Sequence, residues 1–290
     1  MELAHKLIRK LRAYGTLVMF SHTIFSLSFG AVAFLAASNG RPRLWTAAWA
    51  ALAFLSARTG ANALNRAVDA KIDAKNPRTA GRQIPRGEIS VRETVALSLF
   101  CFALLVVSAA MLNPLCLILS PLALLMMASY SYTKRFTWLC HLFLGATCGI
   151  APVGAWLAVT GRFSLPPLLL GAANCLWTAG FDVIYGCQDY DFDRQNGLHS
   201  IPVRFGVAGA LRISTAFHIA ALGCLAAFLL LEPHMGPLFG AGLLAAAGLM
   251  AVQHTMVTPQ RLEGVNTASY SISQLTSLVL LVFGILDICL

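Results

Sequence analysis

Two short windows of the chain hold half of its acidic residues. The sequence has 12 Asp and Glu residues among 290. Six of these lie in windows 69–73 and 182–193, each at the end of a long apolar stretch: Asp69, Asp73, Asp182, Asp189, Asp191 and Asp193. An ionisable residue at the edge of an apolar span is a functional candidate by default. In so acid-poor a chain, two such windows indicate a binding site for cations.

The spacing in both windows places the polar residues on one face of a helix. Residues that are three or four positions apart share a helix face. The first row with this spacing is Arg58, Asn62, Asn65, Asp69 and Asp73. The second row is Asn174, Thr178, Asp182, Tyr185, Asp189 and Asp193. Because carboxylates four residues apart repel each other, we expect a cation to compensate both rows.

A hard divalent cation with oxygen ligands is the natural compensation. Mg²⁺ takes one or two carboxylates and completes its shell with phosphate oxygens. Two facing acidic rows can therefore clamp a diphosphate through Mg²⁺. Basic residues nearby suit the same substrate, since Arg offers phosphate a fork and Lys a point charge. These are Lys71, Arg78, Arg82, Lys134 and Arg135.

The elements that must position these residues are membrane-spanning helices. The chain is 58% hydrophobic and only 11% charged, with a mean hydropathy of +0.72, too apolar for a water-soluble surface. A span needs about 20 apolar residues. Nine stretches qualify or nearly qualify: 18–37, 46–64, 94–112, 114–131, 139–159, 165–185, 208–231, 236–256 and 267–288. The fold predicted is all-α, a single domain of nine transmembrane helices around a central cavity.

The positive charges indicate orientation in a bilayer. With a cytoplasmic N-terminus, 17 of the 21 Lys and Arg lie on the cytoplasmic side and three on the other. Both acid windows and their loops, 65–93 and 186–207, are then cytoplasmic in an inner or plasma membrane. Since the net charge of +9 is explained by this bias, and no basic tract interleaves with aromatics, we expect no nucleic-acid partner.

The two windows also resemble each other. At an offset of 120 residues, Asn62 falls on Asp182, Asn65 on Tyr185, Asp69 on Asp189, Asp73 on Asp193 and Asn76 on Asn196. The matches fall on rare polar residues. This predicts two pseudo-repeated halves that face one cavity.

The motifs resemble the UbiA superfamily of intramembrane prenyltransferases. Asn65–Asp73 matches its NxxxDxxxD signature, and Tyr185–Asp193 its YxxxDxxxD pattern. Residues 78–87 are similar to its RTxxRxxPxG run, and 132–137 to its basic loop. The match covers about 58–205. Residues 20–25 are closer to a branch of quinone biosynthesis that includes the futalosine route to menaquinone.

The resemblance implies a Mg²⁺-dependent transfer of a polyprenyl group from its diphosphate to an aromatic acid, of the 4-hydroxybenzoate or 1,4-dihydroxy-6-naphthoate type. The implied metal ligands are Asn65, Asp69, Asp73, Asp189 and Asp193. Asp182 and Tyr185 would position the acceptor or share metal binding, and Asn62 would bind substrate. Two alternatives stay open: a transporter with the acidic rows as ion sites, and a related enzyme with a different acceptor.

Three more residues have two readings each. Arg58 would bind an acceptor carboxylate or pair with Asp69 or Asp182. His22 and His199 would contact the acceptor or only make hydrogen bonds. Asp191 lies off the helical face, so we expect it to be solvated.

Overall fold

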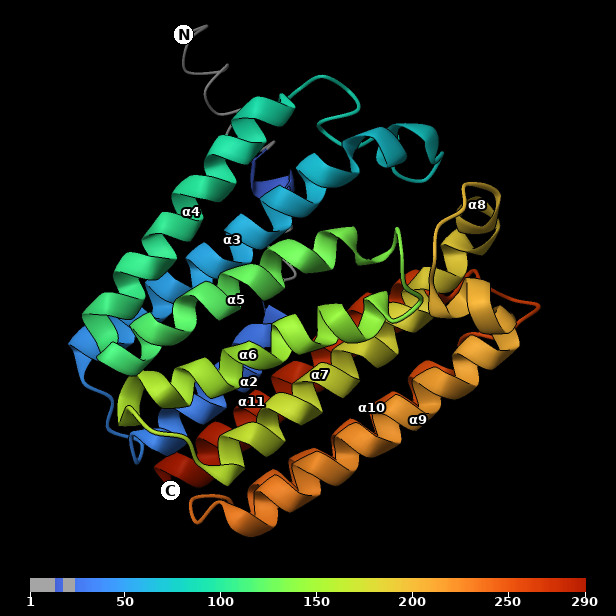
Figure 1. Ribbon diagram of the computed structural model, residues 1–290. Coiled ribbons are helices and arrows are strands. Elements are labelled where there is room, and N and C mark those ends of the chain that lie inside the picture. Colours follow the sequence, from blue (N-terminus) through green and yellow to red (C-terminus); the bar gives the residue numbers. More distant parts are fainter. Residues whose placement is uncertain (1–13, 18–23) are drawn as a thin grey trace, which may run out of the picture.

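The computed structural model describes residues 14–17 and 24–290, and this part of the chain is a bundle of helices without a β-strand. Long helices run roughly side by side, and the loops gather at the two ends of the bundle (Figure 1). Each predicted span overlaps one of them, and residues 18–23 of the first span lie outside the described residues: α2 Ile24–Ala37, α3 Leu44–Lys75, α4 Val91–Leu112, α5 Pro114–Thr133, α6 Cys140–Thr160, α7 Leu165–Gly186, α9 Ile201–Leu231, α10 Pro237–Thr255 and α11 Ser273–Cys289.

Seven helices of the described chain are long and apolar enough to cross a membrane. They are α4, α5, α6, α9 and α10, the helix Leu165–Gln195 that contains α7, and the helix Thr267–Cys289 that contains α11. The described part of α2 has only 14 residues. Helix α3 has 32 residues, but its polar face makes it less apolar. An integral membrane protein is therefore supported, whereas the count of nine spans and the orientation in the bilayer stay predictions.

Local signals set the helix boundaries around the site. Ser90 and Glu93 form a reciprocal capping box at the start of α4, which ends the long loop after α3. Asn113 separates α4 from α5: its side chain caps the Cys116 backbone N–H, and Pro114 occupies the first turn. The chain therefore turns tightly between the predicted spans 94–112 and 114–131.

Helices α6 and α7 approach each other through glycines. A Cβ atom added to Gly149 would lie 2.6 Å from the carbonyl oxygen of Gly171, and one added to Gly145 would overlap the carbonyl of Cys175. Small residues allow such close packing of helices in membranes. The other face of α7 packs into the main core, where Trp177 is fully buried against Phe29 and Phe181. Helix α7 is thereby fixed on two sides.

The spacing predicted that the second acidic row lies on one α-helix, and this prediction is wrong. Helix α7 ends at Gly186, a 3₁₀ turn (η2) covers Cys187–Asp189, and the short α8 covers Tyr190–Gln195. Because a 3₁₀ turn has three residues per turn rather than 3.6, the acids after it do not keep the helical register of Asp182. Helix α3, in contrast, continues unbroken to Lys75. The pseudo-repeat of the two halves therefore stays a prediction.

Candidate active site

Each of the four Asp residues predicted to bind metal contacts one cationic side chain from the loops at the same end of the bundle. The pairs are Asp69 with Arg135 at 3.0 Å, Asp73 with Arg82 at 2.7 Å, Asp189 with Arg78 at 2.5 Å, and Asp193 with Lys134 at 2.8 Å. All four cations had been predicted as diphosphate ligands. The structure therefore brings the acids and the bases of the prediction together, in a one-to-one pairing.

The α3 acids are held by their own helix and by both loops. Asn65 Nδ2 donates a hydrogen bond to Asp69 Oδ2 at 3.1 Å. Arg135 Nη2 donates to Asp69 Oδ1 and to the carbonyl oxygen of Val68. One turn further, Arg82 Nη1 lies 2.7 Å from both carboxylate oxygens of the buried Asp73.

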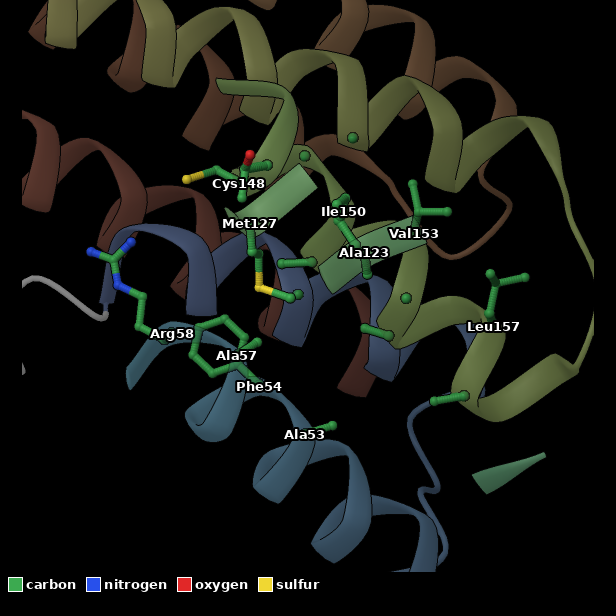
Figure 2. Close-up of a pocket in the computed structure, with 18 of the residues that line it drawn as sticks. Ala53, Phe54, Ala57, Arg58, Ala123, Met127, Cys148, Ile150, Val153 and Leu157 are labelled. Atoms are coloured by element: carbon green, nitrogen blue, oxygen red, sulfur yellow. The ribbon is translucent and has the colours of Figure 1, made fainter. Parts of the chain in front are cut away.

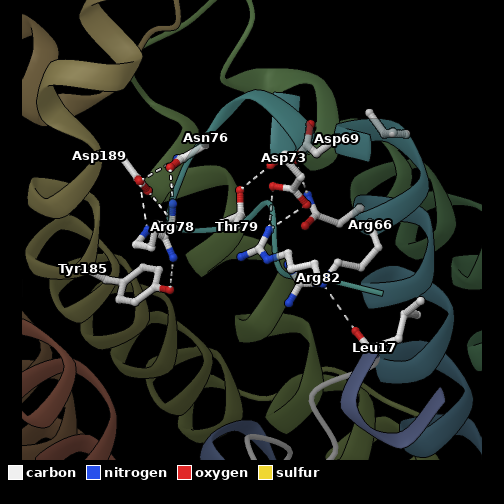
Figure 3. A network of polar contacts seen from close by, with 12 residues as sticks. Leu17, Arg66, Asp69, Asp73, Asn76, Arg78, Thr79, Arg82, Tyr185 and Asp189 are labelled. Carbon is white, nitrogen blue, oxygen red and sulfur yellow. Dashed lines mark hydrogen bonds and ion pairs between the residues drawn. The ribbon is translucent and has the colours of Figure 1, made fainter. Parts of the chain in front are cut away.

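Arg78 and Asn76 join the loop after α3 to the second acidic window (Figure 3). Arg78 donates from Nε to Asp189 Oδ1 at 3.0 Å and from Nη2 to Asp189 Oδ2 at 2.5 Å. Its third nitrogen, Nη1, donates to the Tyr185 hydroxyl. Asn76 Nδ2 donates to Asp189 Oδ1 at 2.9 Å, while its Oδ1 accepts from the Arg78 backbone. The two windows therefore face each other across a shared polar network.

Lys134 stays a cation in this setting. Burial lowers the pKa of its ammonium group, but the charge and hydrogen bond of Asp193 more than offset this, so the pKa lies above its usual value. Burial also disfavours the charged form of Arg78, but Asp189 outweighs it, and the net shift raises the pKa of Arg78. Both groups carry a full positive charge at neutral pH.

The donor set fits Mg²⁺ in its chemistry. Carboxylate and amide oxygens are hard ligands, which Mg²⁺ prefers. In the described chain, however, no three His, Cys, Asp or Glu side chains are grouped closely enough to hold a metal ion. Instead the buried carboxylates of Asp73 and Asp193 are neutralised by Arg82 and Lys134. These long cations would have to turn away for a metal to reach the carboxylates.

An apolar cavity of about 740 Å³ lies beside this network. Its walls come from α2, α3, α4, α5, α6 and α7 and are mostly small or aliphatic (Figure 2). Arg58 and Asn62 are among its few polar lining residues, together with Tyr130. Since Asn65 and Asp69 continue the same face of α3, the cavity ends next to the charged network.

Known proteins are similar to this chain in sequence and in fold. The model of the UbiA prenyltransferase family matches residues 26–277. The chain belongs to the UbiA prenyltransferase family. It is thus an enzyme of the prenyltransferase class, as the motifs predicted, and this sets the transporter alternative aside.

Two relatives and two solved structures illustrate the range of similarity. A 4-hydroxybenzoate octaprenyltransferase of Shewanella amazonensis is 34% identical over 67% of this chain and 66% of its own length, just under two thirds. A 4-hydroxybenzoate octaprenyltransferase of Aeromonas salmonicida is 30% identical over 86% of this chain and 83% of its own length. A UbiA homologue of Aeropyrum pernix K1 superimposes with a TM-score of 0.83 at 34% identity, over 92% of this chain and 98% of that one. A UbiA homologue of Archaeoglobus fulgidus bound to GPP and Mg²⁺ superimposes with a TM-score of 0.78 at 20% identity, over 96% of this chain and 100% of that one. At this identity the similarity is one of fold.

The remaining predicted residues of this UbiA-family chain fall into three groups. Tyr185 joins the network through Arg78, and its ring packs edge-on against Tyr270 at 4.9 Å. Asp182 instead pairs with a histidine, His141 Nδ1 lying 2.7 Å from Asp182 Oδ2. Lys71 is exposed and makes no ion pair within the described chain, so the structure does not bring it to the network.

The predicted histidines add little to the site. His199 is exposed, and its backbone N–H donates to the Lys134 carbonyl at 2.7 Å. His22 lies outside the described residues. Asp191 is exposed, as its position off the helical face predicted.

Sequence reasoning missed three polar residues near the site. Asn76 had been noticed only as a match in the repeat, although that match was the available signal. Arg66 Nε donates to the carbonyl oxygen of Leu17, a contact that spacing does not predict (Figure 3). His141 begins an apolar run, and only the packing of α6 on α7 places it beside Asp182.

Proposed function

We propose that this chain transfers a polyprenyl group from polyprenyl diphosphate to an aromatic acid, with Mg²⁺, in ubiquinone or menaquinone biosynthesis. One observation carries the proposal: a network of four acid–cation pairs adjoins the end of an apolar cavity of about 740 Å³. A polyprenyl diphosphate has the same two parts, a charged head and an apolar tail. Its head suits the network and its tail suits the cavity.

The cations of the network would bind the diphosphate and stabilise it as it leaves. Arg78, Arg82, Lys134 and Arg135 would exchange their carboxylate partners for phosphate oxygens, and the Arg forks allow bidentate contacts. Preorganised positive charge where negative charge develops is usually the largest contribution to catalysis. Mg²⁺ held by Asn65, Asp69, Asp73, Asp189 and Asp193 would supply further charge neutralisation.

The acceptor would enter beside the cavity end. Arg58 lines that end and can bind a carboxylate, while Asn62 can donate or accept a hydrogen bond. The apolar walls keep water from the reactive allylic carbon, which would otherwise be hydrolysed. Relatives named for 4-hydroxybenzoate support an aromatic acid. The sequence of residues 20–25 favours 1,4-dihydroxy-6-naphthoate as a second acceptor to test.

A direct assay tests the proposal. The full chain, purified in detergent or reconstituted in lipid, is incubated with radiolabelled polyprenyl diphosphate and either acceptor, with Mg²⁺ or with EDTA. We expect a lipid-soluble prenylated aromatic product in the Mg²⁺ arm alone, and the acceptor that reacts identifies the branch. Folded protein that forms no product with either acid would contradict an aromatic-acid acceptor, and release of diphosphate in that case would point to an acceptor of another class.

A further inference from the structure

Asp182 is a predicted site residue that pairs with no loop cation within the described chain. A buried histidine contacts it instead. His141 on α6 is 4% exposed, and its Nδ1 lies 2.7 Å from Oδ2 of Asp182 on α7. The Asp182 side chain is 25% exposed, although its neighbours Val183 and Ile184 are fully buried. Asp182 makes no other hydrogen bond within the described chain. One carboxylate oxygen is thus held by His141 while the side chain stays partly exposed.

Asp182 lies between the tail cavity and the diphosphate network. It follows Cys175, a cavity-lining residue of α7, by seven residues, and it precedes Asp189, the η2 residue that Arg78 binds, by seven. At about 1.5 Å per α-helical residue the first separation is about 10 Å along the helix, and the second is slightly longer because a 3₁₀ turn rises about 2 Å per residue. A donor with its head at Arg78 and its tail along Cys175 would place its first carbons near the level of Asp182.

The reaction needs a proton acceptor at this level. When the C–O bond of the donor breaks, diphosphate leaves with the electron pair, and a new C–C bond forms between the allylic carbon and a ring carbon of the acceptor. That ring carbon must then lose its proton to restore aromaticity. A carboxylate beside the ring can take it.

We propose that Asp182 accepts this proton and that His141 is the positioning residue that orients its carboxylate. The inference rests on the proposed function and adds the group that completes the substitution. Tyr270, in the π-helical turn η3 (Thr267–Ile272), interacts with Asp182 and packs against Tyr185, which accepts a hydrogen bond from Arg78. Neither the two tyrosines nor Arg78 offers a carboxylate to take the proton.

The packing of α7 fixes the His141 ring. A Cβ atom added to Gly186 would lie 2.9 Å from His141 Cε1, so the ring is pressed against the α7 backbone where only glycine fits. The α7 backbone therefore confines the ring on this side. A confined ring suits a group that sets the orientation of another side chain.

The test compares transfer to the acceptor with hydrolysis of the donor in its absence. Variants Asp182→Asn, His141→Leu and His141→Asn are assayed for both, and transfer is repeated with an acceptor deuterated at the alkylated carbon. A positioned base contributes about 10²–10⁴-fold. We expect Asp182→Asn to lower transfer at least tenfold more than hydrolysis. For His141→Leu we expect a lower kcat with little change in acceptor KM and a larger deuterium isotope effect, and for His141→Asn, whose amide can still donate to Asp182, a partial rescue.

His218→Asn is the matched control, since His218 is equally buried but contacts His254 and the Trp177 carbonyl. Any loss there should affect transfer and hydrolysis in parallel. The same parallel loss in Asp182→Asn, or no change in isotope effect in His141→Leu, would overturn the inference while leaving the proposed function intact. A wild-type enzyme that prenylates no aromatic acid would overturn both.

Discussion

Arg78 uses all three of its nitrogens at once, two on the Asp189 carboxylate and one on the Tyr185 hydroxyl, and its guanidinium also lies 4.9 Å from the centre of the Tyr185 ring. A planar fork can make this set of contacts, and an ammonium group cannot. This position therefore requires the shape of an arginine side chain as well as its charge.

Replacing Arg78 with Lys should weaken donor binding although it preserves the charge. We expect KM for polyprenyl diphosphate to rise about tenfold, which corresponds to the loss of about 1.4 kcal/mol, a normal value for a charge-assisted hydrogen bond. Steady-state kinetics over a range of donor concentrations would measure it. Arg194→Lys is the control, because Arg194 is exposed on α8, and an equal change in both variants would contradict the role of the fork.

Asp69→Ala should abolish transfer while the protein still inserts and folds. Asp69 is the α3 carboxylate that both Asn65 and Arg135 contact, and it is a predicted metal ligand. Its loss removes an oxygen ligand and leaves Arg135 without its acid. Asp191→Ala, at an exposed position, should keep normal activity. Undiminished turnover by Asp69→Ala would contradict the metal assignment.

At the scale of residues, the sequence predicted types and spacing well and partners less well. The two acidic rows and the basic loops identified all eight side chains of the four acid–cation pairs in advance, because charged residues are rare in an apolar chain. Their pairing depends on how the loop from Asn76 to Ser90 and the loop after α5 fold back, which spacing does not encode. His141 escaped notice because its partner lies on another helix.

Among the helices, α6 and α7 form the closest contact near the site, and glycine makes it possible. Gly149 and Gly171 face each other, and any side chain at Gly149 would meet a backbone oxygen that cannot move aside easily. The separation of α6 from α7 also sets the distance between His141 and Asp182.

Gly149→Val should therefore destabilise the fold and loosen the site. Overpacking of this kind costs about 1–3 kcal/mol, so we expect a lower midpoint of thermal unfolding in detergent and reduced transfer. Gly223→Val on α9 serves as the control, since a Cβ there would meet no atom within 4 Å. Equal midpoints in the two variants would show that the α6–α7 contact is not close.

The helix positions were predictable to within a few residues, except where an apolar span continued as a polar helix. The interruptions of the helices were not predictable. Apolar length and the Asn113–Pro114 turn locate the spans, because a bilayer demands about 20 apolar residues. The 3₁₀ turn at Cys187–Asp189 and the break at Gly206, with a φ of 70° inside α9, depend on tertiary contacts and on the freedom of glycine. Neither interruption changes the hydropathy pattern of the sequence.

At the scale of the whole molecule, the proposed function makes the cavity the feature that selects donors by length. Gly154 lines it, and a Cβ atom there would meet no other atom within 4 Å, so a larger side chain would project into empty space. The volume and shape of the cavity follow from how six helices pack, which sequence pattern alone did not predict.

Gly154→Phe should discriminate between donors by length. We expect KM for a long polyprenyl diphosphate to rise several-fold while KM for geranyl diphosphate changes little, because only the longer tail needs the filled volume. Parallel assays with the two donors would measure the ratio. Equal effects on both donors would mean that the tail lies elsewhere.

Helix α3 has 32 residues and is about 48 Å long, whereas the hydrocarbon layer of a bilayer is about 30 Å thick. In the predicted arrangement of nine spans, its acid-bearing end extends into the hydrated headgroup region while its cavity-lining half stays among acyl chains. Under the proposed reaction, the two products separate into different phases. Inorganic diphosphate dissolves in the aqueous compartment, and the prenylated ring remains in the lipid. Once they have parted, mass action no longer favours the reverse reaction, and the turnover runs in one direction.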